Sequence, residues 1–145
     1  MAATEAMPAK KLIGPFVPVE RGNVPAMGLC YQEATITHVA GGGGHTASYL
    51  VDSGAINSVV AEDVLEGLGV EREGAEVYEM ADGSRVELDH GFARITVDGH
   101  TTAGIVIFGP AGWDGLLGVT VLESLGLALD PKNNRLIRLS AISLK

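Results

Sequence analysis

Cysteine, aromatic residues and positive charge are all scarce in this chain of 145 residues. The single cysteine, Cys30, excludes an internal disulfide and a zinc site built from several cysteines. Ten basic residues against eighteen acidic ones give a net charge of −8, which argues against binding to nucleic acid or to an anionic membrane surface. No run of about 20 apolar residues occurs, so we expect no transmembrane helix.

The N-terminal stretch is rich in proline and lacks the pattern of a secretory leader. Residues 1–11 have no apolar run, and Pro15 and Pro18 interrupt the apolar segment that follows. We therefore expect a cytoplasmic protein. Four of the six prolines lie in residues 1–27, and because proline fixes φ and lacks a backbone donor, we expect an extended N-terminal arm there. Residues 28–145 should form one domain.

Glycine is abundant, with 20 residues, about twice its usual frequency of roughly 7%. Together with many Val, Ile and Thr residues it predicts short strands joined by tight turns. Strands are expected at residues 31–39, 45–52, 76–81, 85–89, 94–97, 101–108, 127–130 and 135–139. The pairs Asp82-Gly83 and Asp98-Gly99 each predict a two-residue hairpin turn. Short helices ending at glycine are expected at residues 61–68 and 120–125, so the predicted fold is mainly β.

An apolar strand runs directly into an acidic residue in the segment Tyr49-Leu50-Val51-Asp52-Ser53-Gly54-Ala55. The strand would hold the Asp52 carboxylate at its rigid end, and Gly54 would allow a sharp turn. The hydroxyl of Ser53 can satisfy a nearby backbone group. Alone, Asp-Ser-Gly is also typical of an ordinary turn after a strand. A second segment, Gly115-Leu116-Leu117-Gly118, runs from an apolar pair into the second predicted helix.

Together the two segments resemble the retropepsin-like aspartic proteases. That family has an apolar-apolar-Asp-Thr/Ser-Gly-Ala motif and a later apolar-apolar-Gly segment before a helix. Residues 99–110 are similar to the strand and loop before that second segment, and Met80-Ala81-Asp82-Gly83 stands where the family has its flap hairpin. The resemblance covers roughly residues 28–131. It implies a closed β-barrel with one or two short helices, active as a dimer and without a cofactor or metal.

The resemblance also implies an aspartic endopeptidase, in which two carboxylates share one proton and activate a water molecule. Neither Asp82 nor Asp114 has the motif around it, so the second carboxylate would be Asp52 of another copy in a C2 homodimer. The residues implied to support the active-site loops are Ser53, Gly54, Leu116, Leu117 and Gly118. The residues implied to contact a peptide or protein substrate are Ala55, Ile56, Asn57, Ala81, Asp82, Gly83, Ala111 and Trp113.

The sequence departs from the retroviral members of the family. Ile56 and Asn57 stand where those enzymes have acidic residues, and Val119 replaces their arginine. An ion-pair network that supports the retroviral dimer is therefore absent. Trp113 either covers the end of the barrel or borders a substrate pocket.

Other chemistries have less support in the sequence. The four histidines lack the spacing of metal ligands, and no Gly-x-Ser-x-Gly marks a serine nucleophile. Cys30 has no nearby basic residue, which is typical of a packed thiol. The alternative functions are a catalytically silent retropepsin-like dimerisation or peptide-binding module, and an unrelated β-barrel binding protein. The intact Asp52-Ser53-Gly54 favours the protease, because a binding module needs no carboxylate pair.

Overall fold

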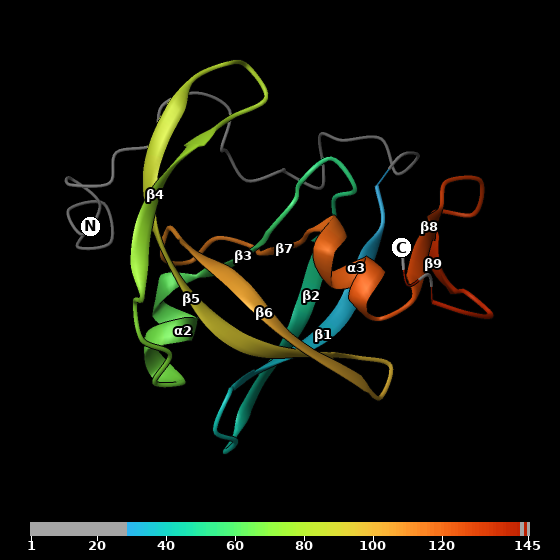
Figure 1. Ribbon diagram of the computed structural model, residues 1–145, viewed down its shortest axis with the longest axis horizontal. Coiled ribbons are helices and arrows are strands. Elements are labelled where there is room, and N and C mark those ends of the chain that lie inside the picture. Colours follow the sequence, from blue (N-terminus) through green and yellow to red (C-terminus); the bar gives the residue numbers. More distant parts are fainter. Residues whose placement is uncertain (1–28, 143, 145) are drawn as a thin grey trace.

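The structure is a computed structural model that describes residues 29–142 and 144 (Figure 1). The predicted N-terminal arm, residues 1–27, lies outside the described residues. The described part is mainly β with two short helices, as predicted. The strands are β1 (Tyr31–His38), β2 (Gly44–Val51), β3 (Ser58–Ala61), β4 (Gly74–Glu79), β5 (Arg85–Val97), β6 (His100–Gly109), β7 (Leu116–Leu117), β8 (Leu127–Asp130) and β9 (Arg135–Arg138). The helices are α2 (Glu62–Gly67) and α3 (Val119–Ser124).

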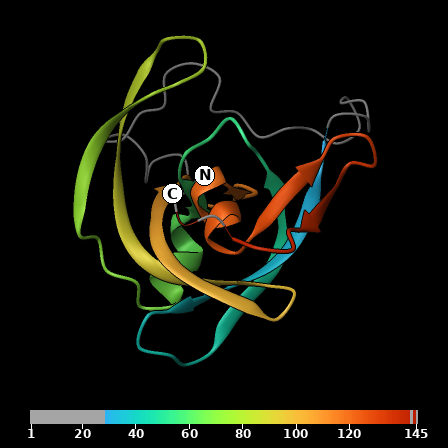
Figure 2. The same ribbon diagram turned by 45° about the vertical axis from the view of Figure 1, so that its right-hand side comes forward.

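Seven of these strands form one sheet in the order β1-β2-β7-β3-β6-β5-β4, and β1 also pairs with β5. The pairing therefore returns to β1 through six strands, and β4 lies outside this ring, paired with β5. β8 and β9 form a separate two-stranded sheet. Figures 1 and 2 show the β4–β5 hairpin projecting on one side of the molecule and β8–β9 on the other.

The core lies inside the ring because side chains alternate between the two faces of each strand. Along β5, for example, Ala93 and Ile95 are buried whereas Phe92 and Arg94 are exposed. The largest fully buried apolar side chains include Phe108, Ile36, Leu65, Ile95, Leu117 and Leu122. Since Leu65 belongs to α2 and Leu122 to α3, both helices contribute to this core.

The hairpin at Asp98-Gly99 has the predicted turn. Both residues have positive φ, 51° and 81°, and Val97 pairs directly with His100. Two consecutive residues with positive φ define the two-residue turn that follows the natural twist of paired strands. This dipeptide therefore fixed the register of β5 and β6 as the sequence predicted.

The hairpin at Asp82-Gly83 has a longer loop than predicted. Its ladder ends at the pair Glu79 and Arg85, and Gly83 alone of the two loop residues has positive φ, 89°. Met80 donates its N–H to the carbonyl of Ser84 over 2.7 Å, and Gly83 donates to the carbonyl of Met80. Hydrogen bonds from the side chain and backbone of Ser84 lower the pKa of Asp82. The connection thus spans residues 80–84 and is not a two-residue turn.

Two further elements differ from the prediction. Residues 85–89 and 94–97 were expected as separate strands but belong to the single 13-residue β5. β3 was not predicted, because its four residues are all buried and run directly into α2. A short, fully apolar run of this kind does not distinguish a strand from a buried helix. Both helices end two residues before the predicted glycine stops, Gly69 and Gly126, whose φ angles are 79° and 71°.

Arg72 ties α2 to the base of the β4–β5 hairpin. Its guanidinium donates hydrogen bonds to Glu62 (2.8 Å) and Glu66 (2.7 Å) on α2 and to Asp89 (2.7 Å) on β5. It also lies over the ring of Phe108, 4.3 Å from the ring centre. Burial alone would lower the pKa of Arg72, but the bonds to Glu66 and Asp89 outweigh it and raise that pKa. Arg72 therefore stays charged and connects α2 with the β4–β5 hairpin and with β6.

Candidate active site

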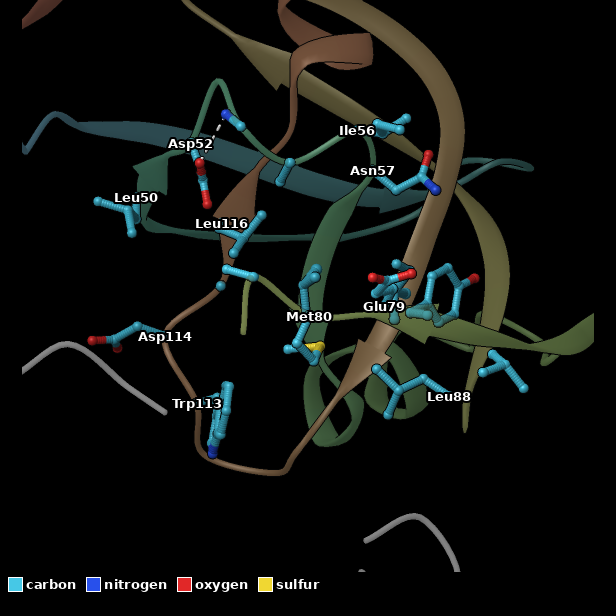
Figure 3. A pocket seen from close by; sticks show the side chains of 18 of the residues that line it. Leu50, Asp52, Ile56, Asn57, Glu79, Met80, Leu88, Trp113, Asp114 and Leu116 are labelled. Carbon is cyan, nitrogen blue, oxygen red and sulfur yellow. Dashed lines mark hydrogen bonds between the residues drawn. The ribbon is translucent and has the colours of Figure 1, made fainter. Parts of the chain in front are cut away.

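A cavity of about 700 Å³ lies between the loop after β2, the segment before β7 and the β4–β5 hairpin (Figure 3). Its lining is mostly apolar. Among the described residues that line it, the charged ones are Asp52, Glu79 and Asp114, all acidic. Cavities of this size accommodate drug-sized ligands.

The floor of the cavity is a row of apolar side chains from neighbouring strands. Leu50 pairs with Leu116, Leu116 with Val59, and Val59 with Ile107. Tyr31 extends the row, because it pairs with Leu50 on the other side. Directly paired residues place their side chains on the same face of a sheet. All five residues accordingly line the cavity.

Asp52 directly follows β2 at the rim of the cavity, and both its backbone and its carboxylate are fixed. Its N–H donates to the carbonyl of Leu117 over 3.0 Å, and its carbonyl accepts from the N–H of Ala55 over 3.1 Å. The N–H of Gly54 donates to Asp52 Oδ1 over 2.9 Å, drawn as a dashed line in Figure 3. Gly54 does not have the positive φ that a sharp glycine turn would use. Its role here is to hold the carboxylate through its backbone.

Gly118 locks the Asp52 loop against the start of α3. A Cβ atom at this position would lie 2.6–2.8 Å from backbone atoms of Ile56 and Asn57, closer than real Cβ contacts. The φ of Gly118 is −89°, so the close approach and not the backbone conformation requires glycine here. Its N–H donates to the buried hydroxyl of Ser58 over 2.9 Å. The two sequence segments of the predicted site are therefore joined through backbone contacts.

The structure brings many of the predicted site residues together. Those that line the cavity are Asp52, Gly54, Ala55, Ile56, Asn57, Ala81, Leu116 and Trp113. Leu117 and Gly118 lie behind them and support the Asp52 loop. Three predicted substrate contacts, Asp82, Gly83 and Ala111, are outside the lining.

Ser53 has a different environment from the one expected. It is exposed, and its hydroxyl makes no hydrogen bond to any residue in the described part of the chain. Ser58 makes the connection between the two loops instead. The clue in the sequence was a hydroxyl residue at the start of an otherwise apolar run, where a buried polar group needs a partner.

Sequence reasoning missed much of the lining. The residues concerned are Tyr31, Leu50, Val59, Val77, Tyr78, Glu79, Met80, Leu88, Ile107, Asp114 and Gly115. Several of them stand beside the motifs, so proximity along the chain was a usable signal. Tyr31, Val59 and Ile107 depend on strand register, which no local pattern reveals.

Trp113 lies in the loop before β7, which α2 holds in place. The side chain of Asp63 on α2 accepts a hydrogen bond from the N–H of Gly112 over 3.2 Å. The N–H of Trp113 donates to the carbonyl of Pro110, also over 3.2 Å. Figure 3 shows Trp113 at the edge of the cavity across from Asp52. This position agrees with the interpretation that Trp113 borders the pocket.

Within residues 29–142 and 144, no group of three or more His, Cys, Asp or Glu side chains could hold a metal ion. No helix in the same part of the chain is long and apolar enough to span a membrane. The chain matches no model of a known protein family and no curated protein.

Proposed function

We propose that the chain is a retropepsin-like aspartic endopeptidase of the cytoplasm, with its ring of strands as the barrel of that fold. The observation that carries the proposal is the placement of Asp52. Its carboxylate is held by Gly54 at the rim of an apolar cavity, and its backbone is bonded to Leu117. Fixing a carboxylate beside space for a peptide is the arrangement that general acid–base hydrolysis requires.

The second carboxylate in this proposal is Asp52 of another copy. Asp114 also lines the cavity, but Figure 3 shows its carboxylate directed away from Asp52. Across a two-fold axis, one Asp52 would take a proton from water as the water attacks the peptide carbonyl carbon. The other would give its proton to the carbonyl oxygen, and the C–N bond of the tetrahedral intermediate would then break as a carboxyl group protonates the leaving amine. In the aspartic mechanism the two carboxylates hold one proton between them.

Exposed apolar side chains support a dimer of this kind. Ile56, four residues after Asp52, is 70% exposed. At the other end of the chain Ile137, Leu139 and Ile142 are 40%, 45% and 55% exposed. Covering these side chains with a second copy would remove apolar surface from water. The exposed Ser53 is also open to a partner subunit.

The decisive experiment compares Asp52→Asn with Asp114→Asn, since both residues line the same cavity and only one carries the motif. Asp52→Asn keeps the size of the side chain but removes the base, so peptide hydrolysis should fall by about 10²–10⁴-fold or more. Asp114→Asn should keep most of the activity. Circular dichroism and sedimentation should show the same fold and the same dimer for wild type and both variants.

Three other outcomes would contradict parts of the proposal. Equal hydrolysis by wild type and Asp52→Asn would exclude the aspartic mechanism. An active wild type that sediments only as a monomer at high concentration would exclude the shared site. An inactive but dimeric wild type that binds peptides would favour the catalytically silent module.

A further inference from the structure

Met80 connects the loop of the β4–β5 hairpin with the floor of the cavity. It is the first residue beyond the β4 ladder, and its backbone closes the loop by the bond to Ser84. Side chains two positions apart share one face of a strand, so Met80 and Tyr78 face the same way. Both pack against a small apolar cluster whose buried members are Val59, Val86, Leu88 and Ile107.

The rest of β4 gives the hairpin little support on the cavity side. β4 pairs with β5 alone in the described sheet, and Ala75, Glu76, Val77 and Glu79 are all exposed. Burial, with a smaller effect from Glu76, raises the pKa of Tyr78, which agrees with its inward position. The loop end of the hairpin is therefore held against the ring by Tyr78 and Met80 together with Val86 and Leu88 of β5, which are 3% and 2% exposed.

Met80 covers the same surface that an apolar ligand would use. Val59 and Ile107, which belong to the cluster under Met80, are also part of the cavity floor. Leu116 packs against the same cluster and pairs with Val59. Figure 3 shows the side chain of Met80 in the middle of the cavity, near Leu116. A methionine side chain is unbranched and flexible, so it fills such a site without fixing its shape.

We propose that Met80 is an internal occupant of the ligand site, which keeps the hairpin closed until a peptide replaces it. The peptide would carry an unbranched apolar side chain, of the size of methionine or norleucine, that takes the place of Met80 on the floor. That the ligand is a peptide rests on the proposed function. The further inference adds which class of side chain the peptide carries and that the hairpin must open before the peptide can bind. A ligand that must first open the hairpin binds with an affinity reduced by the open fraction.

The test uses the Asp52→Asn background, in which bound peptide should stay intact, and compares Met80→Ala with Met80→Leu. Glu87→Ala is the matched control, because Glu87 is an exposed residue of the same hairpin and is outside the cavity lining. Hydrogen exchange is measured over residues 74–89. Binding is measured with blocked hexapeptides Ala-Ala-X-X-Ala-Ala, where X is norleucine, valine or glutamate.

Met80→Ala should raise exchange in the hairpin and tighten binding of the norleucine peptide by about threefold to tenfold, because the open state becomes more populated. Met80→Leu and Glu87→Ala should stay near the parent in both measurements. The norleucine peptide should bind more tightly than the valine and glutamate peptides.

Weaker binding by Met80→Ala with unchanged exchange would make Met80 an ordinary ligand contact and overturn the inference. A valine peptide that binds as well as norleucine would overturn the side-chain class. If no hexapeptide binds, a peptide ligand is rejected and hydrogen exchange tests the rest of the inference. Faster hairpin exchange in Met80→Ala would then still support a hairpin that Met80 holds closed. Unchanged exchange would overturn that role as well. Hydrolysis by wild type is a separate measurement, so failure here and failure of the proposed function are distinguishable.

Discussion

The two walls of the cavity are built in different ways. The wall that carries Asp52 is held by backbone hydrogen bonds and by the close approach of Gly118 to Ile56 and Asn57. The hairpin wall is fixed at its base by Arg72, and its loop end rests on the apolar side chains of Tyr78, Met80, Val86 and Leu88. Backbone contacts between short loops leave few alternative geometries, whereas apolar side chains can separate and repack. The residue that needs an accurate position thus lies on the rigid wall, and the wall that must admit a ligand is the adaptable one.

The largest stability effect should come from Gly118→Ala in the rigid wall. The added methyl group meets backbone atoms that cannot rotate away, and the bond to Ser58 is disturbed. We expect a loss of about 2–4 kcal/mol in the free energy of unfolding, from overpacking and a weakened buried hydrogen bond. Urea unfolding measures it. Gly104→Ala is the control, since nothing lies within 4 Å of a Cβ there, and a similar loss in both variants would contradict the close-packing argument.

Tyr49 should make the rigid wall sensitive to alkaline pH. It is buried, its ring lies against Gly115, and burial raises its pKa to about 12. An unfolded tyrosine ionises near pH 10, so between pH 10 and 12 the unfolded chain loses a proton that the folded chain retains. Stability from this group is complete below pH 10 and falls as pH rises, by about 2–3 kcal/mol in total. Tyr49→Phe should lack this part of the alkaline slope in urea unfolding, and identical slopes would show that Tyr49 is not responsible.

Arg72→Met tests the fixed base of the hairpin wall. Methionine keeps the apolar contact with Phe108 but leaves three carboxylates without their shared cation. Two of them, Glu62 and Asp89, are only 12% and 13% exposed. We expect a loss of about 1–2 kcal/mol, and faster hydrogen exchange in residues 74–89. Arg135→Met is the control, because its 3.8 Å pair with Asp130 is exposed and should contribute less than about 0.5 kcal/mol.

The smallest expected effect is a difference in unfolding free energy between alanine substitutions in the two Asp-Gly hairpins. Gly83→Ala and Gly99→Ala introduce similar backbone strain, about 1–2 kcal/mol, since both glycines have positive φ. In the hairpin at Gly99 the strands pair up to the turn, so the strain should lower global stability. At Gly83 the loop can open locally and relieve it, so exchange at residues 80–84 should rise while global stability changes by less than half as much. Equal global losses would mean that the hairpin loop is as firmly held as the ring.

The sequence predicted best where structure is local. Asp52 and its backbone partner Gly54 are neighbours in the chain, and Asp98-Gly99 determines its turn without help from other segments. Asp82-Gly83 was misread because its turn depends on where the ladder ends, at Glu79 and Arg85. The cavity floor was missed because Tyr31, Leu50 and Ile107 come together through strand pairing. The contact of Gly118 with residues 56 and 57 likewise spans about sixty positions, a separation at which no short pattern is informative.

The length of β5 has a mechanical consequence. Its first half forms the hairpin wall, and its second half pairs with both β6 and β1 inside the ring. Because the second half of β5 is held in the ring, movement of the hairpin is limited to the first half of the strand. Close contacts hold the strand where its two halves meet: an added Cβ at Gly91 would collide with the carbonyl of Glu71, and Asp89 is bonded to Arg72. Opening at the loop should therefore bend the strand on the loop side of Asp89, while the strand beyond it stays still.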